Sequence, residues 1–110
     1  MRDHSKLRAF ELADEVTLLV YRVTQKLPKD EIYGLTSQMR RAAVSVPSNI
    51  VEGCARESET EYLRFLEIAF GSLRELHYQI GLPMRLVYSE ALKHYACEQR
   101  SLRRRRYLAD

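Results

Sequence analysis

Two groups of polar residues in this 110-residue sequence have types and spacing that could bind a ligand. The first group, the polar stripe, recurs at three- and four-residue steps along residues 38–56. Such steps place side chains on one helix face, where arginines, carboxylates and small hydroxyls can form charge-assisted hydrogen bonds. The polar stripe consists of Gln38, Arg41, Ser45, Ser48, Asn49, Glu52 and Arg56.

The polar stripe has three interpretations, which the sequence leaves open. It can be a solvated helix face, a buried polar network that sets helix register or subunit contacts, or a strip that binds a ligand. Arg56 and Glu52, four residues apart, have the spacing of a helical ion pair, and Arg41 is a further group able to form charge-assisted hydrogen bonds. These properties fit all three interpretations.

The second group lies at the basic end of the chain. Residues 1–99 carry 13 Lys+Arg against 14 Asp+Glu, whereas residues 100–110 carry five arginines against Asp110. Because each helical residue rotates by about 100°, four consecutive arginines cannot share one helix face. They are either a solvated tail or an anchor for nucleic-acid phosphates, which planar guanidinium groups bind well. The arginines are Arg100, Arg103, Arg104, Arg105 and Arg106.

We expect no catalytic residues, no metal site and no cofactor. A di-iron bundle needs Glu-x-x-His on two helices, and none of His4, His77 and His94 has a glutamate three residues before it. Cys54 and Cys97 lack a Cys-x-x-Cys spacing and are expected to be reduced, buried thiols. With no visible signal peptide and only short apolar runs, the chain is expected to be cytoplasmic and to have no membrane partner.

Apolar periodicity predicts an all-α fold, with a single domain over residues 1–110 that forms an up-down antiparallel four-helix bundle. The first helix ends at Pro28, and Pro47 is expected to kink the second helix near its middle rather than end it. Ser58 and Glu61 have capping-box spacing for the third helix. Gly81 and Pro83 are expected to interrupt that helix, and Ser89 to cap a fourth.

The periodicity also predicts which residues face inward. Several further apolar residues lie outside these faces, so the first three helices have more apolar surface than one small bundle covers. For the first helix the inward residues are Leu12, Ala13, Val16, Leu19, Val20, Val23 and Leu27; for the second, Leu35, Met39, Ala42, Ala43, Val46, Ile50 and Cys54; for the third, Tyr62, Leu66, Ala69, Leu73, Leu76 and Ile80; for the fourth, Leu92, Tyr95, Ala96 and Leu102.

Two blocks carry a family resemblance over roughly residues 7–80. The first contains Ser-Asn-Ile-x-Glu-Gly at residues 48–53, and the second contains Ala-x-Gly-Ser-Leu-x-Glu-Leu at residues 69–76. In these motifs the chain resembles the bacterial four-helix bundle family, also known as 23S rRNA intervening-sequence proteins. The polar positions that match the family include Ser72 and Glu75, which we add to the polar stripe. The interruption expected at Gly81 and Pro83 and the arginine-rich end depart from the family pattern.

The resemblance implies an assembly rather than an enzyme. Family members form homopentamers with a central channel and have no established catalytic residues. A related branch, the accessory protein of diversity-generating retroelements, binds a reverse transcriptase and RNA. The resemblance therefore implies a homo-oligomeric scaffold that binds RNA or a nucleic-acid-processing protein; the alternative is a protein–protein adaptor without nucleic-acid affinity.

Overall fold

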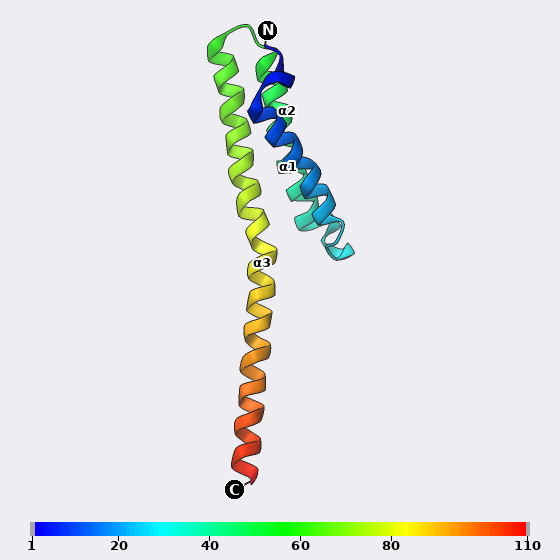
Figure 1. Ribbon diagram of the computed structural model, residues 1–110, viewed down its shortest axis with the longest axis vertical. Coiled ribbons are helices and arrows are strands. Elements are labelled where there is room, and N and C mark those ends of the chain that lie inside the picture. Colours follow the sequence, from blue (N-terminus) through cyan, green and yellow to red (C-terminus); the bar gives the residue numbers. More distant parts are fainter. Residues whose placement is uncertain (1, 110) are drawn as a thin grey trace. The chain divides into compact units, whose positions relative to one another are not determined.

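The structure, a computed structural model, describes the backbone of residues 2–109 and the side chains of residues 2–30, 34–86 and 90–105. Within the described backbone the regular structure is entirely helical, which confirms the predicted all-α class. The α-helices are α1 (Arg8–Thr24), α2 (Ser37–Cys54) and α3 (Glu59–Ala109) (Figure 1). Two short 3-10 helices (His4–Lys6 and Lys29–Glu31) and a π-helix (Ile32–Thr36) complete the described elements.

The chain divides into two compact units, Met1–Gln79 (unit 1) and Ile80–Asp110 (unit 2). Unit 1 contains α1, α2 and the first turns of α3, and unit 2 contains the rest of α3.

The core of unit 1 is built around α2. Six of the seven apolar residues predicted to face inward from the second helix lie within α2 and are each at most 7% exposed, and the seventh, Leu35, is half-buried. The six contribute to two core clusters, and both clusters also contain residues of α1 and α3. One cluster consists of Ala13, Val46, Ile50, Cys54 and Ala69, and the other of Val20, Met39, Ala42, Ala43 and Leu76.

The buried line of α1 differs from the prediction. Leu12, Leu19 and Val23 are 45–56% exposed, whereas Thr24 is buried and Thr17 is half-buried. Each threonine donates its hydroxyl hydrogen to a backbone carbonyl four residues earlier, Thr17 to Ala13 at 2.8 Å and Thr24 to Val20 at 2.7 Å. A hydroxyl that is satisfied in this way can enter the interior at little cost, so the polar threonines lie in the packed line.

Pro47 lies inside α2, and the helix continues through it, as predicted. Proline has no N–H, so the carbonyl of Ala43 loses its helical partner, and Ala43 is only 1% exposed. The hydroxyl of Thr17, on α1, lies 3.0 Å from this carbonyl oxygen and 2.8 Å from that of Ala13. Its single hydrogen is shared between the two carbonyls, so α1 supplies the donor that α2 lacks.

Gly53 allows α2 and α3 to approach closely near the end of α2. A Cβ atom at this position would lie 3.0 Å from the Cβ of Phe65 and 3.2 Å from the carbonyl oxygen of Tyr62. Both neighbouring atoms belong to the backbone or are attached directly to it, so neither can move away without moving α3. Only glycine fits this contact without separating the two helices.

Two short segments make contacts at the end of unit 1 where α2 leads into α3. Ser58 precedes α3 and accepts a hydrogen bond from the N–H of Glu61 at 3.3 Å, which confirms the predicted cap. The backbone N–H of Arg2 donates to the carbonyl of Cys54 at 2.9 Å. The guanidinium of Arg2 lies 3.9 Å from the ring centroid of Tyr62. The Asp3 carboxylate accepts hydrogen bonds from the hydroxyl and from the backbone N–H of Ser5. Both bonds stabilise its charged form and lower its pKa, and the hydroxyl has the larger effect.

Unit 2 corrects several predictions. α3 runs through Gly81, Pro83 and Ser89 without a break, so the expected interruption and the cap at Ser89 are wrong, and the four-helix bundle is not confirmed. A proline removes one helical hydrogen bond, and good helix formers on both sides allow the helix to continue. The residues predicted to face inward from the fourth helix are all exposed, and so is Cys97. These inward predictions were Leu92, Tyr95, Ala96 and Leu102.

The shared hydroxyl predicts a specific energetic coupling. Thr17→Val should lower the free energy of unfolding by about 1–3 kcal/mol, because it leaves the buried Ala43 carbonyl without a donor. In a Pro47→Ala background, the new backbone N–H can bond to Ala43, so the same Thr17 substitution should cost less. Urea unfolding of the four proteins measures the coupling, and strictly additive effects would contradict the proposed role of Thr17.

The close approach at Gly53 predicts opposite effects of one substitution at two glycines. Gly53→Ala should lower the free energy of unfolding by about 1–3 kcal/mol through overpacking against α3. Gly71→Ala is the matched control, because a Cβ there meets no atom within 4 Å. It should raise stability by about 0.5–1 kcal/mol through helix propensity. Equal effects at both positions, measured at one protein concentration, would rule out the steric account.

Candidate functional site

The middle of the polar stripe is a hydrogen-bonded contact between α2 and α3. The hydroxyl oxygens of Ser45 and Ser72 lie 2.8 Å apart, although the residues are 27 positions apart in sequence. The side-chain amide of Asn49 donates to the carbonyl and to the hydroxyl oxygen of Ser45, at 2.8 and 3.0 Å. All three residues are half-buried. These three residues therefore form a hydrogen-bonded contact between the two helices, and their role in setting helix register stays a prediction.

The remaining members of the polar stripe do not join this network. Glu52 and Arg56 form an exposed ion pair at 3.4 Å, and such pairs contribute little stability. Glu75 accepts a hydrogen bond from Gln79 at 3.2 Å, and Gln79 is only 4% exposed. Gln38 and Arg41 are exposed at the other end of the stripe.

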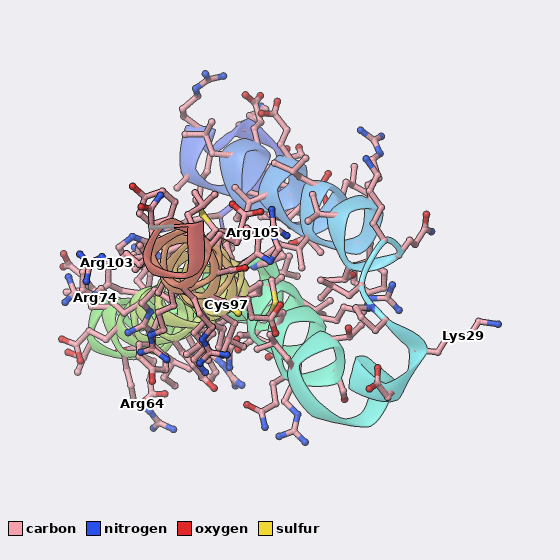
Figure 2. The ribbon with its side chains drawn as sticks, turned by 90° about the horizontal axis from the view of Figure 1, so that it is seen from below. Lys29, Arg64, Arg74, Cys97, Arg103 and Arg105 are labelled. Carbon is pink, nitrogen blue, oxygen red and sulfur yellow. The ribbon has the colours of Figure 1, made fainter. Side chains whose placement is uncertain are left out.

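The arginine-rich end is part of α3, so its side chains point in different directions from one helix. Figure 2 shows Arg103 and Arg105 leaving α3 on opposite sides. With about 100° of rotation per residue, Arg100, Arg103 and Arg104 fall within a third of the circumference, and Lys93 lies on the same side two turns earlier. We call these four residues the basic face. All four side chains are exposed, whereas Arg105 points elsewhere and the side chain of Arg106 lies outside the described residues.

Cations near the carboxyl end of a helix also interact favourably with the helix dipole. This effect needs no ligand and explains arginines in the last turns of α3. It does not explain the length of the basic face, about three turns from Lys93 to Arg104, because the dipole effect falls off within the last turn.

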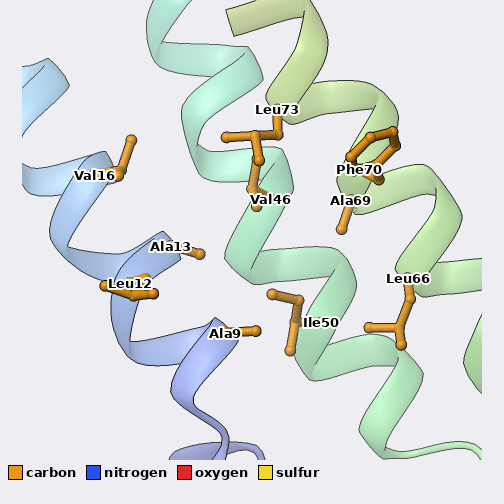
Figure 3. Close-up of a pocket in the computed structure, with 10 residues that line it drawn as sticks. All are labelled: Ala9, Leu12, Ala13, Val16, Val46, Ile50, Leu66, Ala69, Phe70 and Leu73. Carbon is orange, nitrogen blue, oxygen red and sulfur yellow. The ribbon is translucent and has the colours of Figure 1, made fainter. Parts of the chain in front are cut away.

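An apolar groove of about 340 Å³ lies on unit 1, between α1, α2 and the start of α3. Figure 3 shows side chains from all three helices directed toward it, and only carbon groups line it. Phe70, at one side, is 62% exposed, and Leu12 and Leu73 are 45% and 42% exposed. The groove is lined by Ala9, Leu12, Ala13, Val16, Val46, Ile50, Leu66, Ala69, Phe70 and Leu73.

No cluster of three or more His, Cys, Asp or Glu side chains in the described part of the chain could hold a metal ion. His94 lies 3.0 Å from Glu98, four residues later, and both side chains are exposed. No helix among the described residues is long and apolar enough to cross a membrane. Cys54 is buried and free, whereas Cys97 is exposed and free, so only the first cysteine matches the prediction.

The sequence patterns missed three residues of these sites. Thr17 and Thr24 interrupt the apolar pattern of α1, and Lys93 lies outside the arginine run. The seven-residue spacing of Lys93 and Arg100 is a signal that could have found Lys93, whereas no spacing distinguishes the two buried threonines from exposed ones.

These features define an all-helical protein whose surface carries an apolar groove, a partly buried polar contact and a basic helix face. The model of one protein family, described as 23S rRNA-intervening sequence protein, matches residues 5–108. Because this match covers nearly the whole chain, the chain belongs to that family, as the sequence motifs predicted. No curated protein matches the chain.

Proposed function

We propose that this chain is a non-catalytic scaffold that assembles with copies of itself, as a homopentamer, and binds RNA or a nucleoprotein partner. The apolar groove on unit 1 is the single observation that supports assembly most strongly. The basic face on α3 and the family description support the RNA partner. The same proposal includes a cytoplasmic location, where such a partner would be met.

Apolar side chains remain exposed on every α-helix of the described residues. Monomeric proteins rarely leave large contiguous apolar patches in water, because covering them is favourable by about 25 cal/mol per Å². A head-to-tail contact repeated around a ring would cover the same patch on every copy. The largest exposures in unit 1 belong to Phe70, Tyr78, Leu19 and Leu18, and those in unit 2 to Met84, Leu86, Tyr95 and Leu102.

A four-helix arrangement belongs to this proposal as well. Leu92, Tyr95 and Leu102 recur at helical steps of three and seven residues, so they form an apolar line on unit 2. We propose that, in the assembly, this apolar line packs against the three helical segments that make up a unit 1. Unit 2 would then supply the fourth helix of a bundle.

The proposed assembly predicts the particle mass and its sensitivity to the groove. Light scattering of the purified chain should give a multiple of 12.9 kDa, near five copies. Phe70→Gln should lower the mass or weaken association, because it removes an aromatic side chain from the groove. Ile68→Gln is the control, since Ile68 is also exposed but does not line the groove. A stable, soluble monomer at micromolar concentration would contradict the proposal.

The proposed RNA partner predicts a steep salt dependence. The logarithm of the binding constant for single-stranded RNA should fall linearly with the logarithm of salt concentration, with a slope of about −0.7 per engaged phosphate. Truncation after Leu102 removes Arg103–Arg106 and should make the slope less steep. Arg104→Gln should do so by about 0.7, and Arg105→Gln, with the same change of charge on another side of α3, by less.

Two outcomes of the salt titration would count against the RNA partner. A slope unchanged by truncation would remove the arginines from RNA binding. No measurable affinity for RNA, combined with capture of a protein partner that salt does not weaken, would favour the alternative function. That alternative is an adaptor whose apolar groove binds a partner protein, and the carbon-only lining of the groove is the observation that favours it.

A further inference from the structure

A second pocket lies on unit 1, on the other side of α2 from the apolar groove, and its chemistry differs. It has a volume of about 650 Å³ and is lined by two arginines, three hydroxyl-bearing side chains, a tyrosine ring and one valine. Among the described side chains, none that lines it is a carboxylate. The lining residues are Tyr21, Thr36, Ser37, Arg40, Arg41, Val44 and Ser45. We propose that this pocket binds a phosphate group.

Arg40 is held in place before any ligand arrives. Its Nε atom donates to the hydroxyl oxygen of Thr24 at 2.9 Å, and one terminal nitrogen lies 3.5 Å from the carbonyl oxygen of Tyr21. The guanidinium carbon lies 4.7 Å from the ring centroid of Tyr21. These contacts fix the plane of the guanidinium, so binding an anion costs less side-chain entropy than at a free arginine.

The positive charge of the pocket is not neutralised within the described part of unit 1. Neither Arg40 nor Arg41 forms an ion pair with a described side chain, whereas Arg8, Arg56 and Arg64 each pair with a glutamate. Arg40 is also half-buried, which makes an uncompensated cation more costly than it would be in water. An anion in the pocket would supply the missing counter-charge.

A buried hydroxyl provides an independent observation. Thr36 lines the pocket, is only 3% exposed, and its Oγ1 atom has no hydrogen-bond partner among the described residues. It immediately precedes α2, yet its side chain makes no capping bond. Buried hydroxyls are nearly always hydrogen-bonded, and an acceptor bound in this pocket could satisfy that of Thr36. Phosphate oxygens accept from both hydroxyls and guanidinium groups.

This proposal does not depend on the arginine-rich end of the chain, because the pocket belongs to unit 1. The phosphate can come from two sources, a small free phosphate or the backbone of a nucleic acid. Both present tetrahedral oxygens with negative charge, and the experiment below separates them.

The test uses the full-length chain with inorganic phosphate and pyrophosphate as probes, titrated by calorimetry at constant ionic strength. Wild type should bind at least one of the two probes, and Arg41→Gln should weaken that binding about tenfold or more, as expected for a charge-assisted hydrogen bond. Arg74→Gln is the matched control; Arg74 lies on α3 outside the pocket and its side chain is exposed (Figure 2). Equal weakening by both substitutions, or no binding by wild type, would overturn the proposal.

Thr36→Val gives a second readout that a purely structural role would not produce. It replaces an unsatisfied hydroxyl with an isosteric methyl group, so without ligand the melting temperature should stay the same or rise. The rise in melting temperature on adding the probe should become smaller than in wild type. An undiminished phosphate-dependent shift would show that Oγ1 does not face the ligand and would overturn its assigned role.

The same variants distinguish the sources. If single-stranded RNA binding also weakens in Arg41→Gln but not in Arg74→Gln, the pocket takes a backbone phosphate. If only the small-phosphate probes respond, the ligand is a free phosphate, and RNA binding by the arginine-rich end is judged separately by the truncation after Leu102. The phosphate-pocket proposal can thus be contradicted while the scaffold proposal stands. The scaffold proposal can likewise be contradicted while the phosphate-pocket proposal stands.

Discussion

The packing of unit 1 depends on the proline inside α2. Pro47 leaves the Ala43 carbonyl without a helical donor at a position that water does not reach, and such a carbonyl is costly unless another group satisfies it. The hydroxyl of Thr17 is that group, and it holds α1 at one height along α2. Two contacts fix the register of α3 along α2. They are the hydroxyl pair of Ser45 and Ser72 and the close approach at Gly53. α2 is therefore the element against which both other helices are positioned.

This arrangement explains why α2 combines an apolar face with polar positions next to it. Apolar burial supplies most of the stabilisation, since fully burying a side chain such as Leu76 contributes about 1.5–3 kcal/mol. Apolar contacts are not directional, however, and they permit helices to slide. Hydrogen bonds with defined partners and a glycine contact with no spare room remove that freedom. The consequence is a unit with one helix register whose outer surfaces remain available for binding.

The sequence allowed much of this structure to be predicted, with failures of three physical kinds. The face of α2 was predicted correctly because its burial follows apolar periodicity alone. The face of α1 was misplaced because Thr17 and Thr24 are buried through hydrogen bonds that hydrophobicity does not register. The break at Gly81 and Pro83 was wrong because the loss of one hydrogen bond does not end a long helix. Within the polar stripe, sequence spacing could not tell which members would meet α3.

The different environments of the two cysteines have a practical consequence. Cys54 is sealed in the core at 1% exposure, whereas Cys97 is exposed on α3 (Figure 2), within about 60° of Arg100 around the helix axis. A maleimide dye added to the folded, unmodified protein should therefore attach at a single position. That position adjoins the basic face, so the fluorescence of a dye attached at Cys97 can report the approach of a ligand to that face.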